Sequence, residues 1–139
     1  VSKAIRTNDM SMRASSVSAH PMVREKLVEM QQKIAKDKGY ILDGRDIGTV
    51  VLPDAEVKVY MIASVEARAK RRFKEYEEKH IEADYDEIYQ DIEKRDYQDM
   101  NRKTSPLRKA DDAKEIDTSD MTIEEVVSAI RNLIQPCIE

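Results

Sequence analysis

Three groups of charged residues in this 139-residue chain have the types and spacing needed to bind a polyanion. The first lies in the segment Gly39–Gly48, which contains all three glycines of the chain and brings Asp43, Arg45 and Asp46 together. Glycine lets the backbone turn sharply or approach a ligand closely. Because ligands of open parallel sheets bind at strand ends, this segment is a candidate binding loop. The alternative is a surface loop in which Arg45 and Asp46 form an ion pair.

The second group lies on a helix that Ser64 is predicted to cap. Arg68 and Arg72 are four residues apart and therefore project from one face, with Arg71 beside them. The same helix also carries several glutamates. The alternative to a binding site is therefore a solvated basic face that these glutamates balance.

The third group combines two guanidinium groups with a carboxylate. Arg95, Asp99 and Arg102 follow one another at helical spacing and continue the apolar stripe of Ile88 and Ile92. A change from apolar to charged residues along one face is typical of a helix that runs from the core into a cleft. Guanidinium groups suit bidentate contact with phosphate oxygens. An Arg–Asp–Arg ladder within the helix is the structural alternative.

Helices and short strands must hold these groups in place. Pro21 begins a helix whose apolar residues recur at spacings of four, three and four, and Gly39 is positioned to end it. The apolar runs Tyr40–Asp43 and Val57–Ala63 predict strands buried in a parallel sheet. Asp43 then stands at the carboxyl end of the first strand.

Further elements are predicted on both sides of these strands. Residues 1–20 have few apolar anchors and are interpreted as broken helix and loop, although Val1–Arg6 looks like the inside of a helix and suggests a truncated or processed chain. Helices are predicted over residues 65–78 and from Asp84, and a short strand over 113–117. The order of elements predicts an α/β fold with parallel strands. A last helix opens with the capping box Thr122-Ile123-Glu124-Glu125 and is predicted to bury Ile123, Val126, Val127, Ile130 and Leu133.

Composition argues against several classes of protein. The net charge of −4 gives no reason to expect nucleic-acid or membrane binding. The single Cys137 cannot form an internal disulfide, and no His/Cys set has metal-ligand spacing. A reducing, cytoplasmic setting is therefore expected. No apolar run approaches the ~20 residues of a membrane span.

Over nearly its whole length the sequence resembles the bacterial cytidylate kinases, which are nucleoside-monophosphate kinases. The stretch that begins at Asp43 is the most specific, because related kinases share its opening and then continue differently. The matching stretches are Ile5–Thr7, Ala14–Ser15, Val23–Glu25, Asp43–Val51, Pro53–Ala55, Glu66–Arg72, Arg95–Asp96 and Asp99 with Asn101–Arg102.

The resemblance implies a parallel-sheet P-loop nucleoside-monophosphate-kinase fold that here lacks its N-terminal strand and phosphate loop. The implied reaction is ATP-dependent phosphorylation of CMP or dCMP to the diphosphate. The implied parts are a helical monophosphate-side part (1–38), core strands and loop (39–67), a lid with flanking helices (68–102), and a core strand with the C-terminal helix (103–139).

The resemblance also implies roles for individual residues. Ser15, Arg24 and Asp46 would hydrogen-bond the cytosine, with Asp46 accepting from its exocyclic amine. Asp99 would contact the sugar, and Asp43 would orient waters on a Mg²⁺ that accompanies ATP. The arginines that would hold phosphate groups are Arg45, Arg95 and Arg102 on the monophosphate side and Arg68, Arg72 and, as a further candidate, Arg71 on the lid.

One feature of the family has no counterpart in the sequence, the Gly-x-x-x-x-Gly-Lys-Ser/Thr loop that cradles ATP phosphates. The strand before that loop would lie between the strands near residues 40–43 and 57–63, and its absence would leave sheet edges open. The 139-residue chain alone is therefore expected to be inactive, and a complete protein is expected to be a monomer. Two alternatives stay open: another monophosphate kinase, and a catalytically silent nucleotide-binding or helical interaction module.

Overall fold

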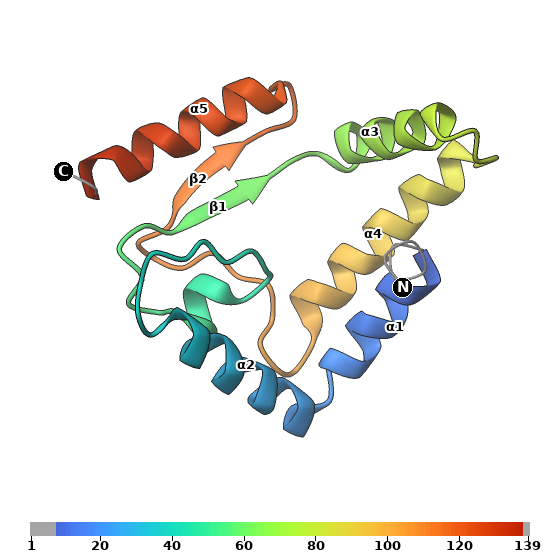
Figure 1. The fold of residues 1–139 in the computed structure, drawn as a ribbon. Helices are drawn as coiled ribbons and strands as arrows, with labels where there is room; N and C mark the ends of the chain where they lie inside the picture. Colours follow the sequence, from blue (N-terminus) through green and yellow to red (C-terminus); the bar gives the residue numbers. More distant parts are fainter. Residues whose placement is uncertain (1–7, 138–139) are drawn as a thin grey trace.

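The computed structural model describes residues 8–137, in which two helical pairs and a small sheet are joined by loops (Figure 1). The helix predicted at Val1–Arg6 and the matching stretch Ile5–Thr7 lie outside the described residues. The prediction of broken helix and loop over residues 1–20 is wrong from residue 8 onward, because α1 (Asn8–Ser18) is continuous. Serine is only moderately unfavourable in helices, and the alanine, arginine and methionines of this segment are good helix formers.

The second helix, α2 (Pro21–Ala35), begins with proline at its first turn, as predicted. It ends earlier than predicted, at Ala35, and the chain then turns through Lys38 and Gly39, which have φ angles of 60° and 74°. Glycine adopts this left-handed conformation without the steric cost that a Cβ brings. The turn therefore separates α2 from the candidate binding loop.

The strand predicted over Tyr40–Asp43 is absent, so Asp43 does not stand at a strand end. Tyr40 and Ile41 are 55% and 89% exposed. A strand is stable only when a neighbour accepts and donates its backbone hydrogen bonds, and within residues 8–137 no strand pairs with this segment. The loop leads into η2 (Ile47–Val51), one turn of π-helix in which Val51 is buried.

The sheet has two parallel strands, β1 (Val59–Ile62) and β2 (Lys114–Asp117), with Val59 opposite Lys114 and Ile62 opposite Asp117. These strands confirm the predicted parallel pairing and the α/β character of the chain. They are less buried than predicted, since Met61 is 52% exposed. Beyond β2, the backbone N–H and Oγ1 of Thr118 both donate to the Ile62 carbonyl oxygen, at 2.8 and 3.1 Å.

Lys58 connects the sheet to the loops at its amino end. Its side chain is 8% exposed and donates to the Pro53 carbonyl oxygen and to Asp112 Oδ2, the latter at 2.6 Å. A Cβ added at Gly48 would lie 3.3 Å from Lys58 Cδ, so this glycine leaves room for the lysine stem. The ion pair with Lys58 lowers the pKa of Asp112.

A helical hairpin extends from the sheet. It consists of α3 (Val65–Glu78), capped by the Ser64 side chain, and α4 (Tyr85–Asn101), capped by the Asp84 side chain (Figure 1). Both helices match the sequence prediction. They pack through Ala69 and Ile88, which are 0% and 6% exposed, and through an edge-on contact of the Phe73 and Tyr85 rings at 6.0 Å.

The last helix, α5 (Ile123–Ile134), carries the predicted capping box. The Thr122 side chain accepts from the Glu125 backbone N–H, and the Glu125 carboxylate accepts from the Thr122 N–H. The predicted burial of its apolar stripe is wrong: Ile123 is 78% and Val127 51% exposed, and no residue of α5 is buried. Val126, Ile130 and Leu133 are half-buried, so within residues 8–137 this face is covered only in part.

The capping box gives a prediction for stability. Replacing Thr122 by alanine is expected to lower the free energy of unfolding by about 1 kcal/mol, measured by urea unfolding at pH 7. The Thr122 backbone N–H, which donates to the Glu125 carboxylate, and to a smaller extent the Thr122 side chain lower the pKa of Glu125. The contribution of Glu125 is therefore present above its unfolded-state pKa and is lost as the pH falls through its folded-state pKa. The cost of Thr122→Ala should shrink in acid, whereas Ser128→Ala in mid-helix should not lower stability at either pH. An equal loss from both variants would contradict the prediction.

Candidate functional site

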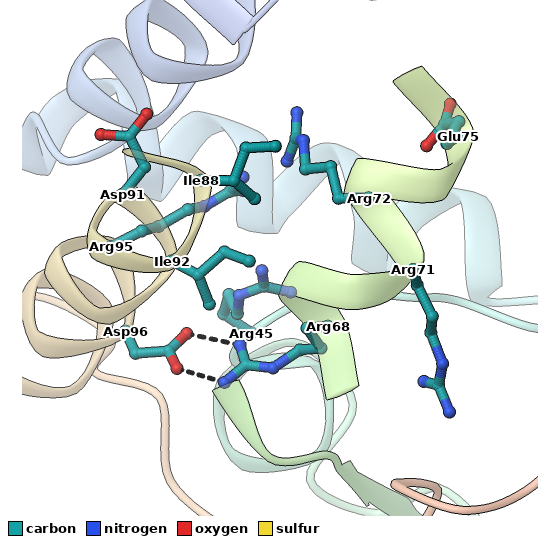
Figure 2. Close-up of a pocket in the computed structure, with 10 residues that line it drawn as sticks. All are labelled: Arg45, Arg68, Arg71, Arg72, Glu75, Ile88, Asp91, Ile92, Arg95 and Asp96. Atoms are coloured by element: carbon teal, nitrogen blue, oxygen red, sulfur yellow. Dashed lines mark hydrogen bonds and ion pairs between the residues drawn. The ribbon is translucent and has the colours of Figure 1, made fainter. Parts of the chain in front are cut away.

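The predicted charged groups line two cavities. The larger, of about 440 Å³, lies between α3 and α4 (Figure 2). Five arginines and three acidic residues line it, so its wall carries more positive than negative charge although the whole chain is acidic. Its lining residues are Arg45, Arg68, Arg71, Arg72, Glu75, Ile88, Asp91, Ile92, Arg95 and Asp96.

Arg68 forms a bidentate ion pair across this cavity with Asp96, drawn as dashed lines in Figure 2. Its Nη1 and Nη2 donate to the two Asp96 carboxylate oxygens at 2.9 and 2.6 Å, and its Nε donates to the Ala63 carbonyl oxygen at 3.0 Å. Hydrogen bonding to Asp96 raises the pKa of Arg68. Paired guanidinium–carboxylate bonds of this kind fix orientation as well as charge, so Asp96 determines where the Arg68 guanidinium lies.

Arg72 and Arg71 are neighbours in sequence but point in different directions (Figure 2). Arg72 projects toward α4, donates from Nε to the Tyr76 hydroxyl at 3.1 Å, and lies 5.7 Å from the Tyr76 ring centroid. Arg71 points away, and its Nη2 donates to the carbonyl oxygens of Thr118, Ser119 and Met121. Arg71 therefore holds the segment between β2 and α5, which its place in the sequence did not reveal.

The smaller cavity, of about 290 Å³, lies between α1, α2, the loop after Asp43 and the end of α4. Arg45 and Arg95 line both cavities, so the two adjoin at these side chains. Eight of the predicted site residues meet there from elements far apart in sequence. The lining residues are Ala14, Ser15, Ser18, Arg24, Gln31, Asp43, Gly44, Arg45, Asp46, Ile47, Arg95, Asp99 and Arg102.

Arg24 and Asp46 form a buried ion pair in the smaller cavity. Arg24 Nη2 donates to Asp46 Oδ1, and the two side chains are 12% and 2% exposed. The pairing of Arg45 with Asp46 that a surface loop would favour is replaced by this longer-range one. Asp46 Oδ2 is also buried and has no hydrogen-bond partner among the described residues. A buried carboxylate oxygen in this state is an acceptor available to a ligand.

Asp99 holds the arginines of the third group together. Its side chain is 5% exposed and accepts from Arg45 Nε at 2.9 Å. Arg95 Nε lies 3.9 Å from Asp99 Oδ2, and Arg102 Nη1 lies 3.8 Å from Asp99 Oδ1. The ladder proposed as a structural alternative is therefore present, but it also takes in Arg45 from the loop. Three guanidinium groups around one carboxylate leave a net positive charge that suits an anion.

Ser15 and Asp43 both line the smaller cavity, Ser15 from α1 and Asp43 from the loop before η2. Ser15 is half-buried on α1, where its carbonyl oxygen accepts from Ser18 Oγ at 3.0 Å. Asp43 is exposed. No group of three acidic, histidine or cysteine side chains among residues 8–137 could form a complete metal cage. Mg²⁺ often uses one carboxylate with waters and substrate phosphates, and the single Asp43 fits that mode.

Two residues of the site were missed by the sequence analysis. Gln31 lines the smaller cavity, seven residues and so two helical turns after Arg24. Asp96 orients Arg68 across the hairpin. The spacing of Gln31 from Arg24 was a usable signal, because both lie on one face of α2. The Arg68–Asp96 pair joins two helices and has no signal in local spacing.

The sequence pattern that defines the cytidylate kinases matches residues 1–136. This chain belongs to the cytidylate kinase family. The cytidylate kinase of Enterococcus faecalis is 55% identical over 135 residues, which cover 97% of this chain and 60% of that protein. That of Streptococcus agalactiae serotype V is 52% identical over 139 residues, which cover all of this chain and 61% of that protein.

The chain thus spans about 60% of the length of the curated relatives it matches, and the match falls on their C-terminal part. The family membership read from the charged motifs is confirmed. Among residues 8–137, no helix is long and apolar enough to cross a membrane.

Proposed function

We propose that this chain forms the monophosphate-binding and lid part of an enzyme that transfers the γ-phosphoryl group of ATP to CMP or dCMP. The observation that carries the proposal is the pair of adjoining cavities with Arg45 and Arg95 at their boundary. One cavity offers a buried carboxylate oxygen and the other a cluster of arginines. A nucleoside monophosphate needs the first kind of site for its base, and the triphosphate of ATP needs the second.

The base would be held by Ser15, Arg24 and Asp46. The unpaired Oδ2 of Asp46 would accept from the exocyclic amine of cytosine, and Arg24, oriented by Asp46, would donate to the acceptors of the ring. Uracil presents a carbonyl oxygen where cytosine has the amine, so two acceptors would face each other without a proton between them. A mismatch of this kind rejects the wrong substrate strongly.

The phosphates would meet where the cavities adjoin. An oxygen of the CMP phosphate attacks the γ-phosphorus of ATP, the bond from that phosphorus to the β–γ bridging oxygen breaks, and ADP leaves. Negative charge is spread over the transferring oxygens, so prepositioned cations supply most of the acceleration. Arg45, Arg95 and Arg102 would hold the acceptor phosphate, while Asp99 would keep them oriented and contact the sugar.

The donor side would depend on α3. Arg68 and Arg72 would bind ATP phosphates when the hairpin closes over them, which also excludes water. Arg71 would support closure indirectly, by holding α3 to the segment after β2. Mg²⁺ would neutralise charge on the β- and γ-phosphates, with Asp43 orienting its waters.

The proposal requires a segment outside this chain to bind the ATP phosphates, as implied by the P-loop fold. We use "complete kinase" for this chain joined to the N-terminal segment that its relatives carry. The exposed Ile123 and Val127 of α5 and the unpaired segment at Tyr40 and Ile41 are consistent with such a segment packing here.

The test compares the 139-residue chain with the complete kinase. We expect ATP-dependent conversion of CMP to CDP by the complete kinase, with far lower turnover of UMP and AMP, and none by the chain alone. The measurement is a coupled assay of ADP release. Turnover of UMP or AMP equal to that of CMP would overturn the substrate assignment, and robust turnover by the chain alone would overturn the need for the N-terminal segment.

A further inference from the structure

Gln31 is a half-buried polar residue of the smaller cavity for which neither the family resemblance nor the charged motifs provide a role. It lies on α2 seven residues after Arg24, so the two side chains share a face of the helix. Gln31 Oε1 is shielded from solvent and has no hydrogen-bond partner among the described residues. By contrast, the neighbouring Gln32 uses its amide to donate to the Val51 carbonyl oxygen at 3.1 Å.

An unpaired buried amide oxygen is unfavourable in the protein by itself. Most buried polar atoms find a partner, and leaving one unpaired costs about 1–3 kcal/mol. An exception that lines a cavity indicates that a ligand supplies the missing donor. Gln31 Oε1 and Asp46 Oδ2 are both of this kind, and both residues line the same cavity.

Two unpaired acceptors at one site specify the ligand group that fits. A primary amine attached to an aromatic ring carries two protons on one nitrogen and can donate to both acceptors at once. A carbonyl oxygen in the same position could pair with neither Asp46 Oδ2 nor Gln31 Oε1 as these two atoms lie in the structure. The nearby Arg24 Nε, also buried without a partner, offers a donor for a ring acceptor beside the amine.

We propose that Gln31 is a specificity-determining residue that accepts the second proton of the base's exocyclic amine, alongside Asp46. The inference rests on the proposed function, since it concerns the base of the acceptor nucleotide. Under this proposal, selection against uracil depends on two acceptors from different elements, Gln31 on α2 and Asp46 in the loop before η2.

The experiment measures kcat/KM for CMP and for UMP in the complete kinase. Gln31→Met has nearly the same size but no acceptor, and we expect it to lower kcat/KM for CMP about tenfold while leaving that for UMP unchanged. Gln31→Glu keeps an acceptor at the same position and should retain more of the CMP preference than Gln31→Met. Gln32→Met is the matched control, and its CMP:UMP ratio should equal that of the wild type.

The outcomes separate this inference from the function on which it rests. If the wild-type complete kinase does not phosphorylate CMP, the proposed function fails. If it does, and Gln31→Met keeps the wild-type CMP:UMP ratio, the inference about Gln31 is overturned. If circular dichroism shows that Gln31→Met folds poorly, Gln31→Glu decides alone. A CMP:UMP ratio about tenfold below that of the wild type, the loss expected for Gln31→Met, would then contradict the proposal.

Discussion

Replacing Asp46 by asparagine is expected to lower kcat/KM for CMP in the complete kinase by about 10²- to 10³-fold. Truncating or neutralising one partner of a desolvated charge pair costs about 2–5 kcal/mol, and each 1.36 kcal/mol corresponds to about a factor of ten. Arg24 would lose its counter-charge in a site where its side chain is only 12% exposed. Asparagine would also place an amide group, with its two N–H donors, in a cavity where the carboxylate now offers an unpaired acceptor.

The measurement is steady-state kinetics with CMP varied at saturating ATP, followed by ATP varied at saturating CMP. The effect should fall on the CMP side, because Asp46 lines the smaller cavity and not the one between α3 and α4. Asp54→Asn, an exposed residue of the following loop, provides a matched control and should behave like the wild type. A CMP kcat/KM within about threefold of the wild type for Asp46→Asn would remove Asp46 from the base site.

The second large effect concerns stability and its dependence on phosphate. Replacing Asp99 by alanine is expected to lower the free energy of unfolding by about 2 kcal/mol, because three guanidinium groups lose the carboxylate between them. This is below the 3–5 kcal/mol typical of fully buried pairs, since the Arg45 and Arg95 side chains are 43% and 34% exposed. In a domain of 150–250 residues this corresponds to a fall in Tm of roughly 4–8 °C.

Inorganic phosphate should reverse part of that loss, because an anion bound among the arginines replaces the missing charge and stabilises the folded state by mass action. Thermal denaturation of the complete kinase at increasing phosphate, at constant ionic strength, is the measurement. Asp91→Ala, which removes an exposed carboxylate one helical turn before Arg95, is the control. If phosphate raises the Tm of the wild type and of Asp99→Ala by the same amount, a bound anion does not replace the charge that Asp99 supplies, and the prediction is wrong.

Much of the helical structure could be predicted because its signals are local. The bounds of α3, the start of α4 and the capping box of α5 follow from capping residues and 3.6-residue periodicity, which depend on neighbours in sequence. The segment at Tyr40 and Ile41 could not be judged this way. An apolar run predicts a strand only when another strand is present to pair with it, and within residues 8–137 that partner is absent.

The candidate site divides in a similar way. Arg95 and Asp99 share one face of α4 and Arg102 is its C-cap residue, so their spacing alone brought them together. The link from Asp46 to Arg24 depends on how the loop meets α2, and it replaced the pairing with Arg45 that adjacency suggests. Adjacency was also misleading for Arg71 and Arg72, since 100° of rotation per residue sends successive side chains of α3 to different surroundings.

The hydrogen bonds of Arg71 have a mechanical consequence for the hairpin. They join the first half of α3 to the segment after β2, and Arg68 joins the same part of α3 to Ala63 and Asp96. The turn between α3 and α4 lies far from the sheet (Figure 1). A rotation of the hairpin about the start of α3 would therefore displace this turn more than any other part of the hairpin. The 14 residues of α3 span about 21 Å, so a rotation of roughly 10° at its start would carry the far end about 4 Å. A small change in the hydrogen bonds of Arg68 or Arg71 would therefore move the far end of the hairpin by several ångströms.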